Sequence, residues 1–270
     1  MENKRIYIDE NDKRVYIDTY VIKDGRVAPR DAILVIPGGG YGQVCSDREG
    51  EFIALAYAAR GVNAFVLEYN VEADSVFPSQ LLDAARAVKW IKEHAEEFHI
   101  NPERIFAVGF SAGAHLAGIL TVHHSIAEEK LGLPADYLKV RGVVLSYPVV
   151  TAYGPTHLGS FKNLSKKPFE ELTDDEKRLY SLEFNVKPDT PPAFIWHTST
   201  DTSVPVNGSL KLAMAYHDAK IPVELHVYPN GPHGLALGTE YTSGGMQTHV
   251  VPDVCGWLDA SVHWMKNTAV

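Results

Sequence analysis

The chain has 270 residues, a hydrophobic content of 45%, a charged content of 22% and a formal net charge of −9 at pH 7. These values are typical of a soluble globular enzyme, and the acidic balance argues against a nucleic-acid binder, which needs a basic face. This length allows either one large domain or two small ones.

The first residues, MENKRIYIDENDKR, are charged and lack the apolar stretch of a secretion signal. No later run approaches the roughly 18 apolar residues of a membrane span. Two cysteines, Cys45 and Cys255, are too few for a disulfide framework. We therefore expect a cytoplasmic protein with two free thiols and no membrane partner.

The predicted elements begin with a β-hairpin and continue as alternating strands and helices. Residues 6–8 and 15–21 alternate apolar and polar side chains around a turn, which is typical of a hairpin with one solvated face. Further strands are predicted at 33–36, 63–69, 104–110, 140–150, 193–198 and 223–228. Helices are predicted at 52–60, 79–99, 112–124, 209–219 and 254–266.

Strands that alternate with helices predict an α/β fold: a mostly parallel twisted sheet with helices on both faces, led here by an antiparallel hairpin. No linker or repeat interrupts the pattern, so we expect a single domain over residues 1–270. Residues 151–192 fit the pattern least, being polar and charged with one short helix near 173–180. A long insertion of this kind is often a lid; a solvated surface excursion is the alternative.

A glycine cluster, PGGGYG, follows the first buried strand at residues 37–42. Glycine has no Cβ, so Gly38, Gly39 and Gly40 let the backbone turn tightly and approach a ligand closely. A dinucleotide-binding loop needs glycine at the sixth position, where Gln43 stands, and a P-loop needs Gly-Lys-Ser/Thr. The spacing excludes both phosphate loops and leaves a loop whose N–H groups bind an oxyanion.

The segment GFSAG, residues 109–113, lies between a predicted strand and an alanine-rich predicted helix. Gly-x-Ser-x-Gly at such a junction is typical of a nucleophile elbow, in which a tight turn presents the serine hydroxyl above the sheet. The pattern predicts Ser111 as a nucleophile. The alternative is a glycine-rich turn with an idle serine.

A serine nucleophile needs a histidine base that a carboxylate orients, and in this arrangement the chain order is Ser, Asp or Glu, then His. Asp201 lies in the loop after the strand at 193–198 and is the predicted acid. His233 lies in the turn PNGPHG after the strand at 223–228 and is the predicted base. Weaker candidates by position are Asp189, Asp218, His226 and His249.

The oxyanion hole of such a site combines the N–H of the residue after the nucleophile with an N–H of the early glycine-rich loop. We therefore expect Ala112, Gly39 and Gly40 to be the donors. Tyr41 and His197 are expected to contact substrate, with packing under the lid and a core position as the respective alternatives.

No metal and no cofactor are expected. The helix histidines His115, His123 and His124 lack the spacing of a metal motif. The carboxylates Glu49 and Glu51 are predicted to form a solvated helix start rather than a catalytic pair.

The four motifs PGGGYG, GFSAGAHLAG, HTSTDTSVP and PNGPHG together resemble the α/β-hydrolases, and more narrowly the small acetyl xylan esterase-like carbohydrate esterases. The resemblance runs from about residue 33 to the C-terminus. It implies the triad Ser111, Asp201 and His233, and removal of acetyl groups from sugars without a cofactor. Relatives similar to hormone-sensitive lipase begin the oxyanion motif with His-Gly-Gly-Gly, whereas Pro37 stands here, so any bracing of the loop by that histidine is lost.

The expected function is a serine esterase that acts through an acyl-enzyme on small acyl esters, above all acetyl esters of xylan-derived or other carbohydrates. Alternatives are a formamidase, amidase or peptidase with the same triad, and a catalytically silent binding protein. The expected partner is a small-molecule or oligosaccharide ester, with no nucleic acid, and a homo-oligomer is compatible with the sequence.

Overall fold

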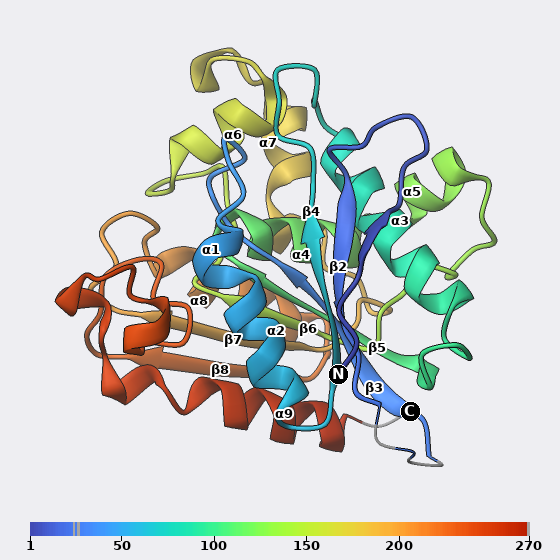
Figure 1. Cartoon of the computed structure of the whole chain (residues 1–270). Coiled ribbons are helices and arrows are strands. Elements are labelled where there is room, and N and C mark those ends of the chain that lie inside the picture. Colours follow the sequence, from blue (N-terminus) through green and yellow to red (C-terminus); the bar gives the residue numbers. More distant parts are fainter. Residues whose placement is uncertain (24, 26–27, 269–270) are drawn as a thin grey trace.

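The computed structural model describes residues 1–23, 25 and 28–268 (Figure 1). These residues contain an eight-stranded sheet with the order β1-β2-β4-β3-β5-β6-β7-β8. The strands are β1 (Arg5–Tyr7), β2 (Tyr16–Tyr20), β3 (Arg30–Ile36), β4 (Asn63–Glu68), β5 (Ile100–Phe110), β6 (Val143–Ser146), β7 (Ala193–Thr198) and β8 (Val223–Tyr228). β1–β2 and β2–β4 pair antiparallel, and all other neighbours pair parallel. The predicted fold class, a mostly parallel sheet with a leading hairpin, is confirmed.

Helices cover both faces of this sheet (Figure 1). They are α1 (Ser46–Glu49), α2 (Glu51–Ala58), α3 (Ser79–Glu93), α4 (Ala112–Val122), α5 (His124–Leu131), α6 (Leu158–Ser165), α7 (Asp174–Tyr180), α8 (Asn207–Asp218) and α9 (Trp257–Asn267). Side chains of α2 and α9 belong to one hydrophobic core, and those of α3, α4 and α8 belong to the other. The arrangement follows from the parallel strands, whose crossover helices must pack on the faces.

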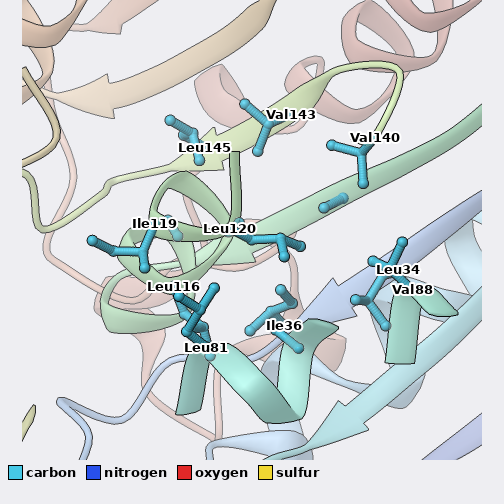
Figure 2. Packing of buried hydrophobic residues seen from close by; sticks show 14 of the residues in the cluster. Leu34, Ile36, Leu81, Val88, Leu116, Ile119, Leu120, Val140, Val143 and Leu145 are labelled. Carbon is cyan, nitrogen blue, oxygen red and sulfur yellow. The ribbon is translucent and has the colours of Figure 1, made fainter. Parts of the chain in front are cut away.

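The period of two in β3 divides its side chains between the two cores. Ile33 and Val35 pack toward α2 and α9, whereas Leu34 and Ile36 pack toward α3 and α4. Figure 2 shows the second core, where Leu81 and Val88 of α3 and Leu116 and Leu120 of α4 surround Leu34 and Ile36. Burying each such side chain contributes about 1.5–3 kcal/mol to stability. The carboxyl end of β3, from which the glycine-rich loop departs, is thereby held rigidly.

Some predicted elements differ from the observed ones at their ends. The strand predicted at 140–150 is restricted to Val143–Ser146, because Tyr147 turns to a positive φ of 39° and Pro148 follows it. The helix predicted at 112–124 ends at Val122, and a separate helix, α5, begins after a break at His123. The helix predicted from residue 79 ends at Glu93, and the last helix begins at Trp257 after a 3-10 turn.

The insertion at residues 151–192 contains two α-helices. The predicted short helix is α7, which begins with a capping box between Thr173 and Glu176. Sequence reasoning missed α6, whose N-cap is His157 rather than Ser, Thr, Asp or Asn. Within the described part of the chain no helix is long and apolar enough to cross a bilayer.

Candidate active site

Ser111 occupies a sharp turn between β5 and α4. Its φ of 55° and ψ of −117° are rare for a residue with a side chain, and the turn is closed by glycines on both sides. A Cβ on Gly109 would lie 2.2 Å from the carbonyl oxygen of Gly113, and a Cβ on Gly113 would lie 2.2 Å from that of Ile36. Only glycine fits at both positions, so the motif GFSAG forms the strand-to-helix elbow that its sequence predicts.

Ser111, His233 and Asp201 form one hydrogen-bonded chain. The Nδ1 atom of His233 lies 2.6 Å from Oδ2 of Asp201, and Nε2 lies 2.7 Å from Oγ of Ser111. A carboxylate can only accept, so Nδ1–H donates to Asp201 and Nε2 is left to accept the Ser111 proton. The three predicted residues are brought together from the ends of β5, β7 and β8, and the base has the tautomer that proton abstraction requires.

Asp201 is held by its own loop and by two histidines. Its Oδ1 accepts the backbone N–H groups of Ser203 and Val204, both at 2.9 Å. Burial by itself would raise the pKa of Asp201, but hydrogen bonds with His197 and His233 and the nearby His233 charge hold that pKa well below its usual range. The carboxylate therefore stays ionised while it orients the base.

The glycine-rich loop lies against the elbow. Gly39 and Gly40 line the same cleft as Ser111, and their φ angles of 123° and 64° favour glycine. The N–H of Gly38 is already used, because it donates to Oε2 of Glu49 at 2.7 Å. Ala112 is the first residue of α4, where backbone N–H groups have no partner inside the helix. The positions of Gly39, Gly40 and Ala112 fit the predicted oxyanion role.

The predictions of substrate contact for Tyr41 and His197 are wrong. Tyr41 is 1% exposed, and its hydroxyl donates to Nδ1 of His115 at 2.8 Å beneath the loop. His197 is fully buried, with Nε2 at 2.9 Å from the carbonyl oxygen of Val204 and 3.3 Å from Oδ2 of Asp201. Each side chain packs inside the protein and supports a site segment instead of facing the cleft.

The cleft at Ser111 has a volume of about 310 Å³, and its lining surface is polar and apolar in nearly equal parts. The insertion supplies two of its residues, His157 and Asn163. The amide of Asn163 donates to the carbonyl oxygen of Gly40 at 2.8 Å, so α6 is attached directly to the glycine-rich loop. Nδ1 of His157 accepts the N–H of Ser160, which leaves the proton of the neutral ring on Nε2. Sequence reasoning did not identify either residue, because the insertion carries no motif.

Glu49 is the largest departure from the sequence prediction. The expectation of a solvated helix start is wrong for this residue, which is 3% exposed beside the cleft. Its neighbour Glu51 is exposed, as predicted. A signal that could have identified Glu49 is its position a few residues after the glycine-rich loop. The short helix α1 lies back against that loop, so that Glu49 reaches the N–H of Gly38.

One group of side chains among the described residues has the geometry to approach a metal ion. Ligand atoms of His124, Asp136 and Asp189 lie within 4.8 Å of one another. Nζ of Lys139 lies 2.9 Å from Oδ1 of Asp136 and 3.0 Å from Oδ2 of Asp189, so a cation of the protein already neutralises these carboxylates. None of these residues lines the cleft at Ser111.

The sequence matches the BD-FAE family over residues 17–216, which is well over half of its length. The chain belongs to the BD-FAE family. This BD-FAE member is 42% identical over 221 residues to Endo-1,4-beta-xylanase B of Butyrivibrio fibrisolvens, covering 80% of this chain and 34% of that protein. It is 27% identical to the Acetylxylan esterase of Xylanibacter ruminicola, covering 84% of this chain and 45% of that protein. The chain thus spans less than half the length of both relatives.

Solved structures match this BD-FAE member over nearly its whole length. MGS-M1, an alpha/beta hydrolase from a Medee basin deep-sea metagenome library, is 34% identical with a TM-score of 0.81, covering 99% of this chain and 98% of that one. The acetyl ester-xyloside bifunctional hydrolase of Caldicellulosiruptor lactoaceticus is 31% identical with a TM-score of 0.81, covering 97% and 95%. The resemblance to α/β-hydrolases that the four motifs carry is confirmed.

Proposed function

We propose that this chain is a serine carboxylic ester hydrolase that removes small acyl groups, above all acetyl, from xylan-derived or other acetylated carbohydrates. The observation that carries the proposal is the series of hydrogen bonds from Ser111 through His233 to Asp201 at a small cleft. An idle serine in a glycine-rich turn would need neither a correctly oriented base nor a buried carboxylate behind it.

In the first half of the reaction, Oγ of Ser111 attacks the ester carbonyl carbon while Nε2 of His233 takes the hydroxyl proton. The resulting imidazolium is stabilised by Asp201, whose contact with Nδ1 is 2.6 Å. The tetrahedral intermediate collapses, His233 returns the proton to the leaving sugar oxygen, and Ser111 keeps the acyl group.

The negative charge on the tetrahedral oxygen needs donors that are already in place. The N–H groups of Ala112, Gly39 and Gly40 are the proposed donors, since that of Gly38 is occupied by Glu49. Removing one such donor typically costs about 3–4 kcal/mol of transition-state stabilisation. In the second half a water molecule, deprotonated by His233, attacks the acyl-enzyme, and Ser111 leaves with the returned proton.

Cleft size and relatives support a small acyl group on a sugar. A volume of about 310 Å³ is small for a binding pocket and leaves little room for a long alkyl chain. The side chains of Arg48, Asn163 and Ser203 at the cleft can form hydrogen bonds with sugar hydroxyls. The relatives named above include an acetylxylan esterase and an acetyl ester-xyloside hydrolase. The proposed mechanism uses side chains and water alone.

The test is hydrolysis of p-nitrophenyl esters with acyl chains of two, four and eight carbons, followed by acetylated xylo-oligosaccharides, with Ser111→Ala as the control. The proposal predicts highest kcat/KM for acetate and release of acetate from the oligosaccharides, both abolished in the variant. A preference for the longest chain would contradict the carbohydrate substrate. Hydrolysis of N-formyl amides but of no ester would favour a formamidase, and no turnover with any substrate would favour a binding protein.

A further inference from the structure

Glu49 lies between the two backbone segments that build the site. Its Oε2 accepts the N–H of Gly38 at 2.7 Å, at the start of the glycine-rich loop. Its Oε1 accepts the hydroxyl of Tyr147 at 2.8 Å. The side chain is 3% exposed, so both contacts are shielded from water. A buried carboxylate is costly unless it is hydrogen-bonded, and here both of its oxygens are.

Tyr147 extends this contact to the segment that carries the base. Its hydroxyl oxygen accepts the N–H of Ala236 at 2.9 Å, three residues after His233. Its ring lies edge-on to the His233 imidazole, with ring centroids 5.0 Å apart. The position of His233 is therefore coupled through one tyrosine to the same carboxylate that holds Gly38.

The hydrogen bonds from Ala236 through Tyr147, and from Gly38, all point toward Glu49, whose carboxylate is the final acceptor. Ala236 donates to Tyr147 and Tyr147 donates to Glu49, while Gly38 donates to the other oxygen of Glu49. A protonated or amidated side chain has only one purely accepting oxygen. If that oxygen keeps the N–H of Gly38, the Tyr147 oxygen must accept from the side chain, and the Tyr147 hydroxyl proton loses its acceptor. Burial raises the pKa of Glu49, and the hydrogen bonds from Tyr147 and Gly38 act against that effect.

We propose that Glu49 is a positioning residue that fixes the glycine-rich loop and the His233 loop relative to each other, so that oxyanion donors and base meet the same substrate atoms. This inference rests on the proposed serine-hydrolase function. Glu49 reaches the start of the loop from α1, through the N–H of Gly38.

The activity test compares Glu49→Gln and Tyr147→Phe with Glu51→Gln, an exposed carboxylate two residues away. Both network variants should lower kcat on p-nitrophenyl acetate by about 10- to 100-fold with little change in KM, since a loop displaced by about 1 Å costs up to about 100-fold. Glu51→Gln should match the wild type. The double variant should lose no more than the stronger single one, because both remove the same link.

A readout independent of turnover is hydrogen exchange of the Gly38 and Ala236 amides. In Glu49→Gln both amides should exchange faster together, whereas Tyr147→Phe should affect Ala236 more than Gly38. Should Glu49→Gln fail to fold, Tyr147→Phe, which keeps the ring against His233, carries the test.

The two proposals fail in different ways. Faster exchange at both amides in Glu49→Gln than in the wild type, combined with a wild type that hydrolyses no substrate, would overturn the proposed function and leave the bracing intact. Strong hydrolysis that Ser111→Ala abolishes, with kcat and amide exchange unchanged in Glu49→Gln and Tyr147→Phe, would overturn the bracing role and leave the function intact. A lowered melting temperature with unchanged kcat in both variants would show that Glu49 only stabilises the fold.

Discussion

Asp201 and His233 meet at 2.6 Å although they come from loops after different strands, β7 and β8. The contact is possible because parallel strands end at the same edge of the sheet, so their following loops are neighbours. It fixes the tautomer of His233 and stabilises the positive charge that the imidazole acquires when it takes the Ser111 proton.

Replacing Asp201 by asparagine should disable the base without unfolding the protein. The asparagine side chain has the same size and can still accept the N–H groups of Ser203 and Val204, but it no longer enforces a proton on Nδ1 of His233. We expect kcat to fall by about 10⁴-fold, as for other triads that lose this carboxylate. Steady-state kinetics beside Asp218→Asn, an exposed aspartate, would check this, and a loss below tenfold would remove Asp201 from the triad.

The elbow glycines should be sensitive to a single methyl group. In Gly113→Ala the new Cβ would lie 2.2 Å from the Ile36 carbonyl oxygen and 2.3 Å from that of Pro37. Such overpacking costs about 1–3 kcal/mol of unfolding free energy. Urea unfolding should show this loss, whereas Gly256→Ala, with helical dihedrals and nothing within 4 Å, should change stability by less than about 0.5 kcal/mol. Equal stabilities of the two variants would contradict the steric account.

The attachment of α6 to the glycine-rich loop should matter for turnover. Asn163 donates to the Gly40 carbonyl oxygen, and Asn163→Asp would place a carboxylate oxygen against that carbonyl. Loss of the hydrogen bond and the added repulsion, roughly 1–2 kcal/mol together, should lower kcat/KM about tenfold or more. The matched control is Lys162→Ala on the exposed side of the same helix. Unchanged kinetics in Asn163→Asp would show that the insertion does not position the loop.

Two buried groups should give opposite slopes to stability against pH. Burial lowers the pKa of His115 to about 4 and raises that of Asp83 to about 7. Between pH 4 and 6.5 the unfolded state binds more protons at His115, so this group makes the free energy of unfolding rise with pH. At Asp83 the folded state binds more protons over the interval between its usual pKa and 7, so this group makes stability fall as pH rises.

Urea unfolding at several pH values would separate the two effects. From pH 4 to 6.5, His115→Gln should gain stability less steeply than the wild type, and Asp83→Asn more steeply, each by at most about 1.4 kcal/mol per pH unit. Curves that run parallel to the wild type for both variants would contradict the assigned pKa directions.

The sequence predicts the fold, and the three residues that the structure brings together at the cleft, because both depend on local patterns. Strand-to-helix alternation predicts which loops share an edge of the sheet, and GFSAG identifies one of those loops as the candidate nucleophile elbow. The chain order of acid and base then restricts Asp201 and His233 to the loops after the last two strands. Because β5 to β8 are parallel neighbours, the loops after them lie at one edge of the sheet, and Asp201 and His233 come within hydrogen-bonding reach of the Ser111 site.

The supporting residues could not be predicted, because their roles arise only from contacts across the fold. Glu49 and Glu51 have the same side chain on adjacent short helices, yet only Glu49 turns inward, toward Gly38 and Tyr147. His197 lies in β7, four residues before Asp201, and nothing in the strand sequence indicates that its Nε2 contacts Oδ2 of Asp201. Asn163 belongs to an insertion with no motif at all.

The most direct test of the central claim, that His233 and Asp201 activate Ser111, is covalent labelling by a fluorophosphonate, with the modified residue located by mass spectrometry. An activated Ser111 would give a single adduct at that residue, none in Ser111→Ala, and labelling slowed by orders of magnitude in Asp201→Asn. An unlabelled wild-type protein, or an adduct at any other residue, would contradict the claim.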